Sequence, residues 1–170
     1  MPGIRLHPNY HGYKLDDQRF IRLLAEAYKR KLRVQIVCWL DNAQHYYLQR
    51  LTPVVEISPL IAAARQFSEL RLVLANAIYT SKNKDTLIHE LAALPNVTFD
   101  FGRMAEATGV DQLVRNVKVD RVVLGSGAPL SPVEPVVVSL QKASLQEGDK
   151  IAIRGSNAQR LTQDSWERSE

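Results

Sequence analysis

Short hydrophobic runs and longer runs with helical spacing alternate along this chain. Five short runs rich in β-branched and aromatic residues predict strands, at residues 3–7, 34–40, 70–75, 96–101 and 121–124. Patterns with one apolar face predict helices between them, at residues 16–31, 58–67, 85–94 and 110–116, and another from residue 131 onward. No tight hairpin turn follows any strand, and the strands recur roughly every 25 to 35 residues. This rhythm indicates parallel strands joined by helical crossovers.

Local signals refine some of these boundaries. Pro8 stops the first strand, so residues 8–13 are expected to form a loop. Ser58 and Pro59 are a typical helix start, because serine caps the helix and proline fits its first turn. Ser131 and the glutamate three positions later, Glu134, have the spacing of a capping box.

Two fold classes fit five repeated βα units: an open doubly wound sheet and part of a (β/α)8 barrel. Gly125-Ser126-Gly127 ends the last strand, but it lacks the spacing of a dinucleotide-binding fingerprint and follows the wrong strand for one. The hydrophobic pattern alone leaves both fold classes open.

Composition narrows the function classes. The chain has 170 residues, of which 45% are hydrophobic and 24% charged, as expected for one globular domain; we place it at residues 1–162, with a polar tail at 163–170. The net charge of +4 is spread without a basic stripe, so no nucleic-acid partner is expected. Cys38 is the one cysteine, which excludes an intrachain disulfide. Neither a membrane span nor a signal peptide is apparent, so a cytoplasmic location is expected.

Polar and aromatic side chains follow several strands, at the edge where α/β proteins hold their ligands. Such side chains suit hydrogen bonding and stacking with a small molecule. The simpler alternative is that they are ordinary, partly exposed loop residues. The candidates for ligand binding are His7, Asn9, Tyr10, His11, Tyr13, Asp41, His45, Asn76, Arg103 and Ser126, with Tyr46, Tyr79 and Asp100 at the same edge.

Two further hypotheses concern individual side chains. Cys38 is expected to be a packed strand residue rather than a nucleophile, although spacing alone would allow it to lie near His45. A new metal site formed by His11, Asp41 and His45 is an alternative that the sequence leaves open.

Three motifs together resemble the amidohydrolase-related family of metal-dependent hydrolases. Residues 123–129 (Val-Leu-Gly-Ser-Gly-Ala-Pro) are similar to the family's Phe-Gly-Ser-Asp-x-Pro strand end. Residues 154–161 (Arg-Gly-Ser-Asn-Ala-Gln-Arg-Leu) are similar to its Gly-Asn-Ala-x-Arg-Leu helix. Residues 3–8 end in His-Pro, as a middle strand of the family does. The resemblance implies a partial (β/α)8 TIM barrel of about five βα units, corresponding to strands four to eight.

The resemblance also implies hydrolysis by a water molecule bound to zinc or manganese. The family's ligands are a His-x-His pair on the first strand, histidines after the fifth and sixth strands, and an aspartate after the eighth that also handles the proton. Here the first strand has no counterpart, and residues 37–39 (Val-Cys-Trp) end the fifth. Asn76 stands at the sixth-strand histidine position, and Gly127 at the aspartate position. We therefore expect no family-type metal centre and no ordinary hydrolytic activity.

Five parallel strands cannot close a barrel, so the outer strands are expected to leave open edges. A second copy of the chain or an upstream segment would cover them, and the chain is expected to be a truncated barrel. The alternative function is a non-catalytic module that binds a small molecule or takes part in assembly.

Overall fold

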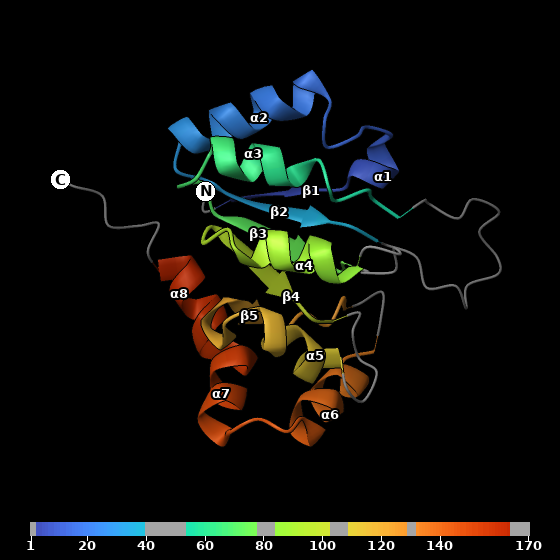
Figure 1. The fold of residues 1–170 in the computed structure, drawn as a ribbon, viewed down its shortest axis with the longest axis vertical. Coiled ribbons are helices and arrows are strands. Elements are labelled where there is room, and N and C mark those ends of the chain that lie inside the picture. The colour runs from blue at the N-terminus through green and yellow to red at the C-terminus, as the bar shows by residue number, and fades with distance from the viewer. Residues whose placement is uncertain (1–2, 40–53, 78–83, 103–108, 129–131, 164–170) are drawn as a thin grey trace.

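A parallel sheet of five strands forms the centre of the protein in a computed structural model, which describes residues 3–39, 54–77, 84–102, 109–128 and 132–163 (Figure 1). The strands are β1 (Gly3–Leu6), β2 (Arg33–Val37), β3 (Leu72–Ala75), β4 (Val97–Asp100) and β5 (Val122–Val123). They lie in the order β1-β2-β3-β4-β5, and all four neighbouring pairs are parallel.

The strand order decides between the two fold classes. In a doubly wound sheet the order reverses at a point inside the sheet. Here every strand pairs with its neighbour in sequence, so the chain winds in one direction, as it does in a (β/α)8 barrel. The predicted partial barrel with five parallel βα units is confirmed.

Helices connect the strands. They are α1 (Pro8–His11), α2 (Gln18–Lys29), α3 (Leu60–Gln66), α4 (Lys84–Ala92), α5 (Gly109–Asn116), α6 (Glu134–Lys142), α7 (Glu147–Ile151) and α8 (Asn157–Gln163). A 3-10 turn (Val119–Arg121) precedes β5, and a π-helical turn (Ala152–Ser156) joins α7 to α8.

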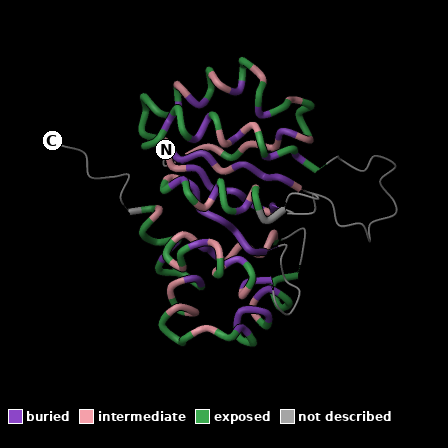
Figure 2. The backbone as a smooth tube through the Cα atoms, viewed as in Figure 1, coloured by how far each residue is buried: buried purple, intermediate pink, exposed green. Residues whose placement is uncertain are grey.

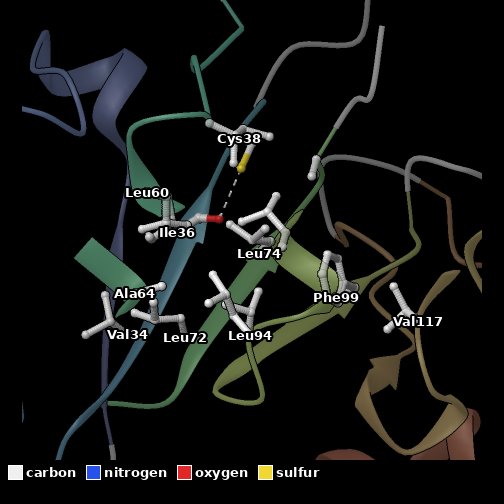
Figure 3. Close-up of a cluster of buried hydrophobic side chains, with 14 of the residues drawn as sticks. Val34, Ile36, Cys38, Leu60, Ala64, Leu72, Leu74, Leu94, Phe99 and Val117 are labelled. Atoms are coloured by element: carbon white, nitrogen blue, oxygen red, sulfur yellow. Dashed lines mark hydrogen bonds between the residues drawn. The ribbon is translucent and has the colours of Figure 1, made fainter. Parts of the chain in front are cut away.

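Alternate residues of the strands face the helices and form the core. Ile36 pairs in register with Leu74, and Leu74 with Phe99, and all three are fully buried. Leu60 of α3 belongs to the same cluster, as the close-up in Figure 3 shows. Buried residues follow the strands and single sides of the helices in Figure 2, the pattern that amphipathic helices on one sheet face produce.

The other alternate residues form a second face of the sheet, here called the inner face. Arg5, Gln35, Val73 and Thr98 form one row across four strands in register. Residues of both outer strands line one pocket on this face together with residues of α8. The sheet is therefore concave on the inner face, as a segment of a barrel wall is.

Some boundary predictions were wrong. Residues 8–11 form the one-turn helix α1 rather than a loop, because proline fits a first helical turn, and Gly12 ends it with φ of 70°. Helix α6 begins at Glu134 with Val133 as its N-cap residue and no side-chain cap, so Glu134 does not hold the third helical position that the predicted capping box requires. Ser131 lies outside the described residues. Helix α3 likewise begins at Leu60 without a side-chain cap from Ser58.

Candidate functional site

A cluster of aromatic rings stands at the end of β1. His11 contacts three of them, with ring centroids 6.5 Å from His7, 5.4 Å from Tyr10 and 6.4 Å from Tyr13. Tyr13 also stacks on Phe20 of α2, at 6.1 Å, which anchors the cluster to the core. The structure thus brings four predicted ligand-binding residues together, although Tyr10 is 71% exposed.

The surroundings of His7 disfavour its protonated form. Burial, followed by the positive charges of Arg5 and His11, lowers the pKa of the His7 imidazole. The Nδ1 atom of His7 and the Nδ2 atom of Asn9 are both buried. Neither atom has a hydrogen-bond partner among the residues that the structure describes. The Asn9 Oδ1 atom accepts a hydrogen bond from the Tyr10 backbone N–H, at 3.0 Å.

Asn76 and the Gly125–Gly127 turn have structural roles at the ends of β3 and β5. Asn76 adopts a left-handed backbone conformation with φ of 53°, which asparagine tolerates better than most residues. Its Nδ2 atom donates a hydrogen bond to the Trp39 carbonyl, at 3.1 Å, and thereby ties β3 to the end of β2. Gly127 is also left-handed, with φ of 69°, and the Ser126 Oγ atom accepts a hydrogen bond from the Ala128 N–H at 3.2 Å.

Asp100, the last residue of β4, is the buried carboxylate at this edge. Its Oδ1 atom accepts a hydrogen bond from the Gly102 N–H, at 2.6 Å. A Cβ atom on Gly125 would lie 1.8 Å from Asp100 Oδ2, so the carboxylate occupies the space that the missing side chain leaves. Burial raises the pKa of Asp100 to about 6, against the opposing effects of the Gly102 hydrogen bond and the Arg5 charge.

The pocket on the inner face has a volume of about 410 Å³. Asp100 lines it near the strand ends, and Arg5 and Gln35 line it farther down. Arg33 donates a hydrogen bond from Nη2 to the Thr162 carbonyl, at 2.8 Å, and both residues also line the pocket. The remaining lining is mainly apolar, contributed by Ile4, Val73, Val123, Leu124, Ala158 and Leu161.

Arg5, Arg33 and Gln35 line the pocket but were not among the ligand-binding residues predicted from the sequence. The sequence did contain a signal for them, because polar residues alternate with apolar ones in Gly3–Leu6 and Arg33–Val37. Such alternation marks a sheet face that is not packed against helices. Asp41, His45 and Arg103, together with Tyr46 and Tyr79, lie outside the described residues, so their predicted roles stay predictions.

Cys38, which follows β2, is packed in the core. Burial and the nearby Asp100 charge raise the pKa of the Cys38 thiol to about 12, and its Sγ atom lies 3.6 Å from the Ile36 carbonyl as a weak donor (Figure 3). Within the described ranges, no three His, Cys, Asp or Glu side chains gather in a way that could hold a metal ion.

The packed character predicted for Cys38 is confirmed by its complete burial. None of the helices in the described part of the chain has the length and apolar composition that crossing a membrane requires.

Comparison with solved structures supports the fold assignment. A 5-carboxyvanillate decarboxylase from Sphingomonas paucimobilis matches with a TM-score of 0.67 at 13% identity, covering 95% of this chain and 58% of that chain. Amidohydrolase 2 from Bifidobacterium longum subsp. infantis has a TM-score of 0.67 at 16% identity, covering 95% and 61%. A dihydroxybenzoic acid decarboxylase from a Polaromonas species, solved with bound manganese and the inhibitor 2-nitroresorcinol, has a TM-score of 0.65 at 11% identity, covering 92% and 58%.

These identities support a shared fold, and the chain spans less than two thirds of the length of each of the three structures. No curated protein matches the chain by sequence. The family model described as amidohydrolase matches residues 1–161, nearly the whole sequence. The chain therefore belongs to the amidohydrolase family.

Proposed function

We propose that this chain binds a small organic acid in the inner-face pocket and does not hydrolyse it through a family-type metal centre. The observation that carries the proposal is the pocket itself, a largely apolar concave surface that Arg5 helps to line. A guanidinium forms two parallel hydrogen bonds with a carboxylate, and an apolar wall suits the body of such a ligand. The volume of about 410 Å³ falls within the usual range for small-molecule sites.

The similar structures support this ligand class by their names. Two of them are decarboxylases of 5-carboxyvanillate and of dihydroxybenzoic acid, which are aromatic carboxylic acids. We extend only the carboxylate to this chain, because Arg5 supplies its counter-charge.

The first experiment tests the role of Arg5 in ligand binding. Isothermal titration calorimetry with 2,6-dihydroxybenzoate should show binding to the unmodified protein. Arg5→Met should weaken this binding at least tenfold, because the carboxylate loses its ion-pair partner. Arg22→Met on the exposed side of α2 removes the same charge away from the pocket and should leave the affinity unchanged. Absence of binding, or equal weakening by both substitutions, would contradict the proposal.

The second experiment concerns the metal. In the resembled family the metal activates water, and here we propose that Asn76 and Gly127 stand at two of its ligand positions. An amide and a glycine do not replace histidine and aspartate as ligands of a transition metal. Protein incubated with Zn²⁺ or Mn²⁺ and then gel-filtered should retain much less than one metal ion per chain by mass spectrometry. Retention of one ion per chain that Asn76→Ala abolishes would sink this part of the proposal.

A further inference from the structure

Three charged residues line the inner-face pocket: Asp100, Arg5 and Arg33. Arg33 is engaged by the Thr162 carbonyl, so we consider Asp100 and Arg5 here. The Asp100 carboxylate lies at the strand ends, and the exposed Arg5 of β1 lines the same pocket. Their charges interact, because Arg5 counteracts the effect of burial on the pKa of Asp100. Both residues are described in full, and no direct salt bridge between them forms.

The position of Asp100 is fixed by its surroundings. Asp100 is 6% exposed, and the Gly102 N–H holds one oxygen at 2.6 Å. Gly125 leaves room for the other oxygen, because any larger residue would place its Cβ 1.8 Å from it. A ligand that fills the pocket thus meets a carboxylate that cannot turn away.

This carboxylate restricts the ligand. A ligand that fills the pocket and brings no hydrogen-bond donor leaves this largely buried anion without a compensating partner, which is costly. A second carboxylate placed there would add repulsion between like charges. An ammonium group provides both a donor and the opposite charge, and Arg5 then receives the ligand's own carboxylate.

We propose that the ligand is an α-amino acid with an apolar side chain, its ammonium group against Asp100 and its carboxylate against Arg5. This inference rests on the proposed function, because it adds an ammonium group to the same organic acid. The side chain lies against Val73, Val123 and Leu161, which line the pocket beside the two charges.

The test compares four probes that differ in one group each. L-Phenylalanine carries both charges, 3-phenylpropanoate lacks the ammonium, phenethylamine lacks the carboxylate, and L-3-phenyllactate has a hydroxyl group in place of the ammonium. At pH 7.5, calorimetry should give L-phenylalanine an affinity at least tenfold higher than that of each of the other three.

Variants then assign the ammonium to Asp100. Asp100→Asn keeps an oxygen that accepts from the Gly102 N–H but removes the negative charge. This variant should therefore bind phenylalanine and 3-phenylpropanoate with about the same affinity. Asp16→Asn, an exposed neighbour of the α2 N-terminus, removes the same charge outside the pocket and should keep the preference. If Asp100→Asn does not fold, the affinities of the unmodified protein decide the question alone.

Each remaining outcome overturns a defined part of the proposal. Equal binding of phenylalanine and 3-phenylpropanoate would refute the ammonium but retain the proposed organic-acid function. Equal binding of phenyllactate would replace the ammonium with a neutral donor. Equal binding of phenethylamine would remove the role of Arg5, and absence of all binding would overturn the proposed function together with this inference.

Discussion

Asp100 shows how burial changes the chemistry of a carboxylate at the end of a strand. Its carboxylate would be more stable in water, so burial favours the protonated form and raises its pKa to about 6. Cys38 lies close enough for the same charge to raise its thiol pKa as well. At this edge of the sheet the Asp100 carboxylate can therefore gain or lose a proton near neutral pH, whereas the Cys38 thiol is unreactive.

The raised pKa of Asp100 predicts how stability depends on pH. A folded-state pKa of about 6, above the usual 3.8, means that the folded protein binds this proton more tightly than the unfolded chain. The stabilisation is complete below the unfolded pKa, and it is lost as pH rises toward about 6. The shift of roughly two units corresponds to about 3 kcal/mol at most.

Asp100→Asn should therefore raise the free energy of unfolding relative to the unmodified protein more at pH 7.5 than at pH 4. Urea unfolding at the two pH values measures this difference. The other acidic residues are the same in both proteins, so their contributions to the pH dependence cancel in the comparison. Asp16→Asn is the matched control and should show no such dependence. An equal effect of Asp100→Asn at both pH values would contradict the assignment.

At the scale of elements, the junction of β4 and β5 is built around two glycines. A Cβ on Gly102 would lie 1.8 Å from the backbone carbonyl oxygen of Gly125, and one on Gly125 would lie 1.8 Å from the Asp100 side chain. The atom that blocks a side chain at Gly102 belongs to the backbone. The atoms that block one at Gly125 belong to the Asp100 side chain, which a substitution can remove. This difference makes the junction testable by double substitution.

Gly125→Ala should lower the free energy of unfolding by about 1–3 kcal/mol, as overpacking does, because the new methyl group displaces the carboxylate. In an Asp100→Ala background the same change should cost less than about 1 kcal/mol, which denaturant titration of the four proteins measures. Gly102→Ala should remain harmful in both backgrounds, because its nearest obstacle is the Gly125 backbone oxygen. Additive effects of Gly125→Ala and Asp100→Ala would show that the two residues do not touch.

The elements also show what could be predicted from the sequence. The five strands were predictable because β-branched runs such as Val34–Val37 have few alternatives as helices. The helix at Pro8–His11 was missed because proline marks both a strand end and a first helical turn. The pocket was missed because it depends on Arg5, Asp100 and Leu161, which lie far apart in sequence and meet only when the sheet curves.

At the scale of the whole molecule, one hydrophobic cluster extends from Leu15, before α2, to Ile153, before α8. Val136 and Leu140 of α6 belong to it as well. Helix α6 and the π-helical turn before α8 thus pack on the same core as the sheet.

Unfolding should therefore be a single cooperative transition. Far-ultraviolet circular dichroism, which follows the helices, and near-ultraviolet circular dichroism, which follows aromatic packing, should give coincident urea curves. An earlier loss of helical signal would mean that α6–α8 unfold independently of the sheet.

The strand order has a consequence for synthesis of the protein. Each strand pairs with the strand made immediately before it, so no strand of the sheet has to wait for a partner strand that is made much later. Closing a short crossover costs less chain entropy than closing a long one. During translation, each new strand can therefore add to the exposed edge of the strand synthesised before it. No strand pair that has already formed has to separate so that a later strand can insert between its members.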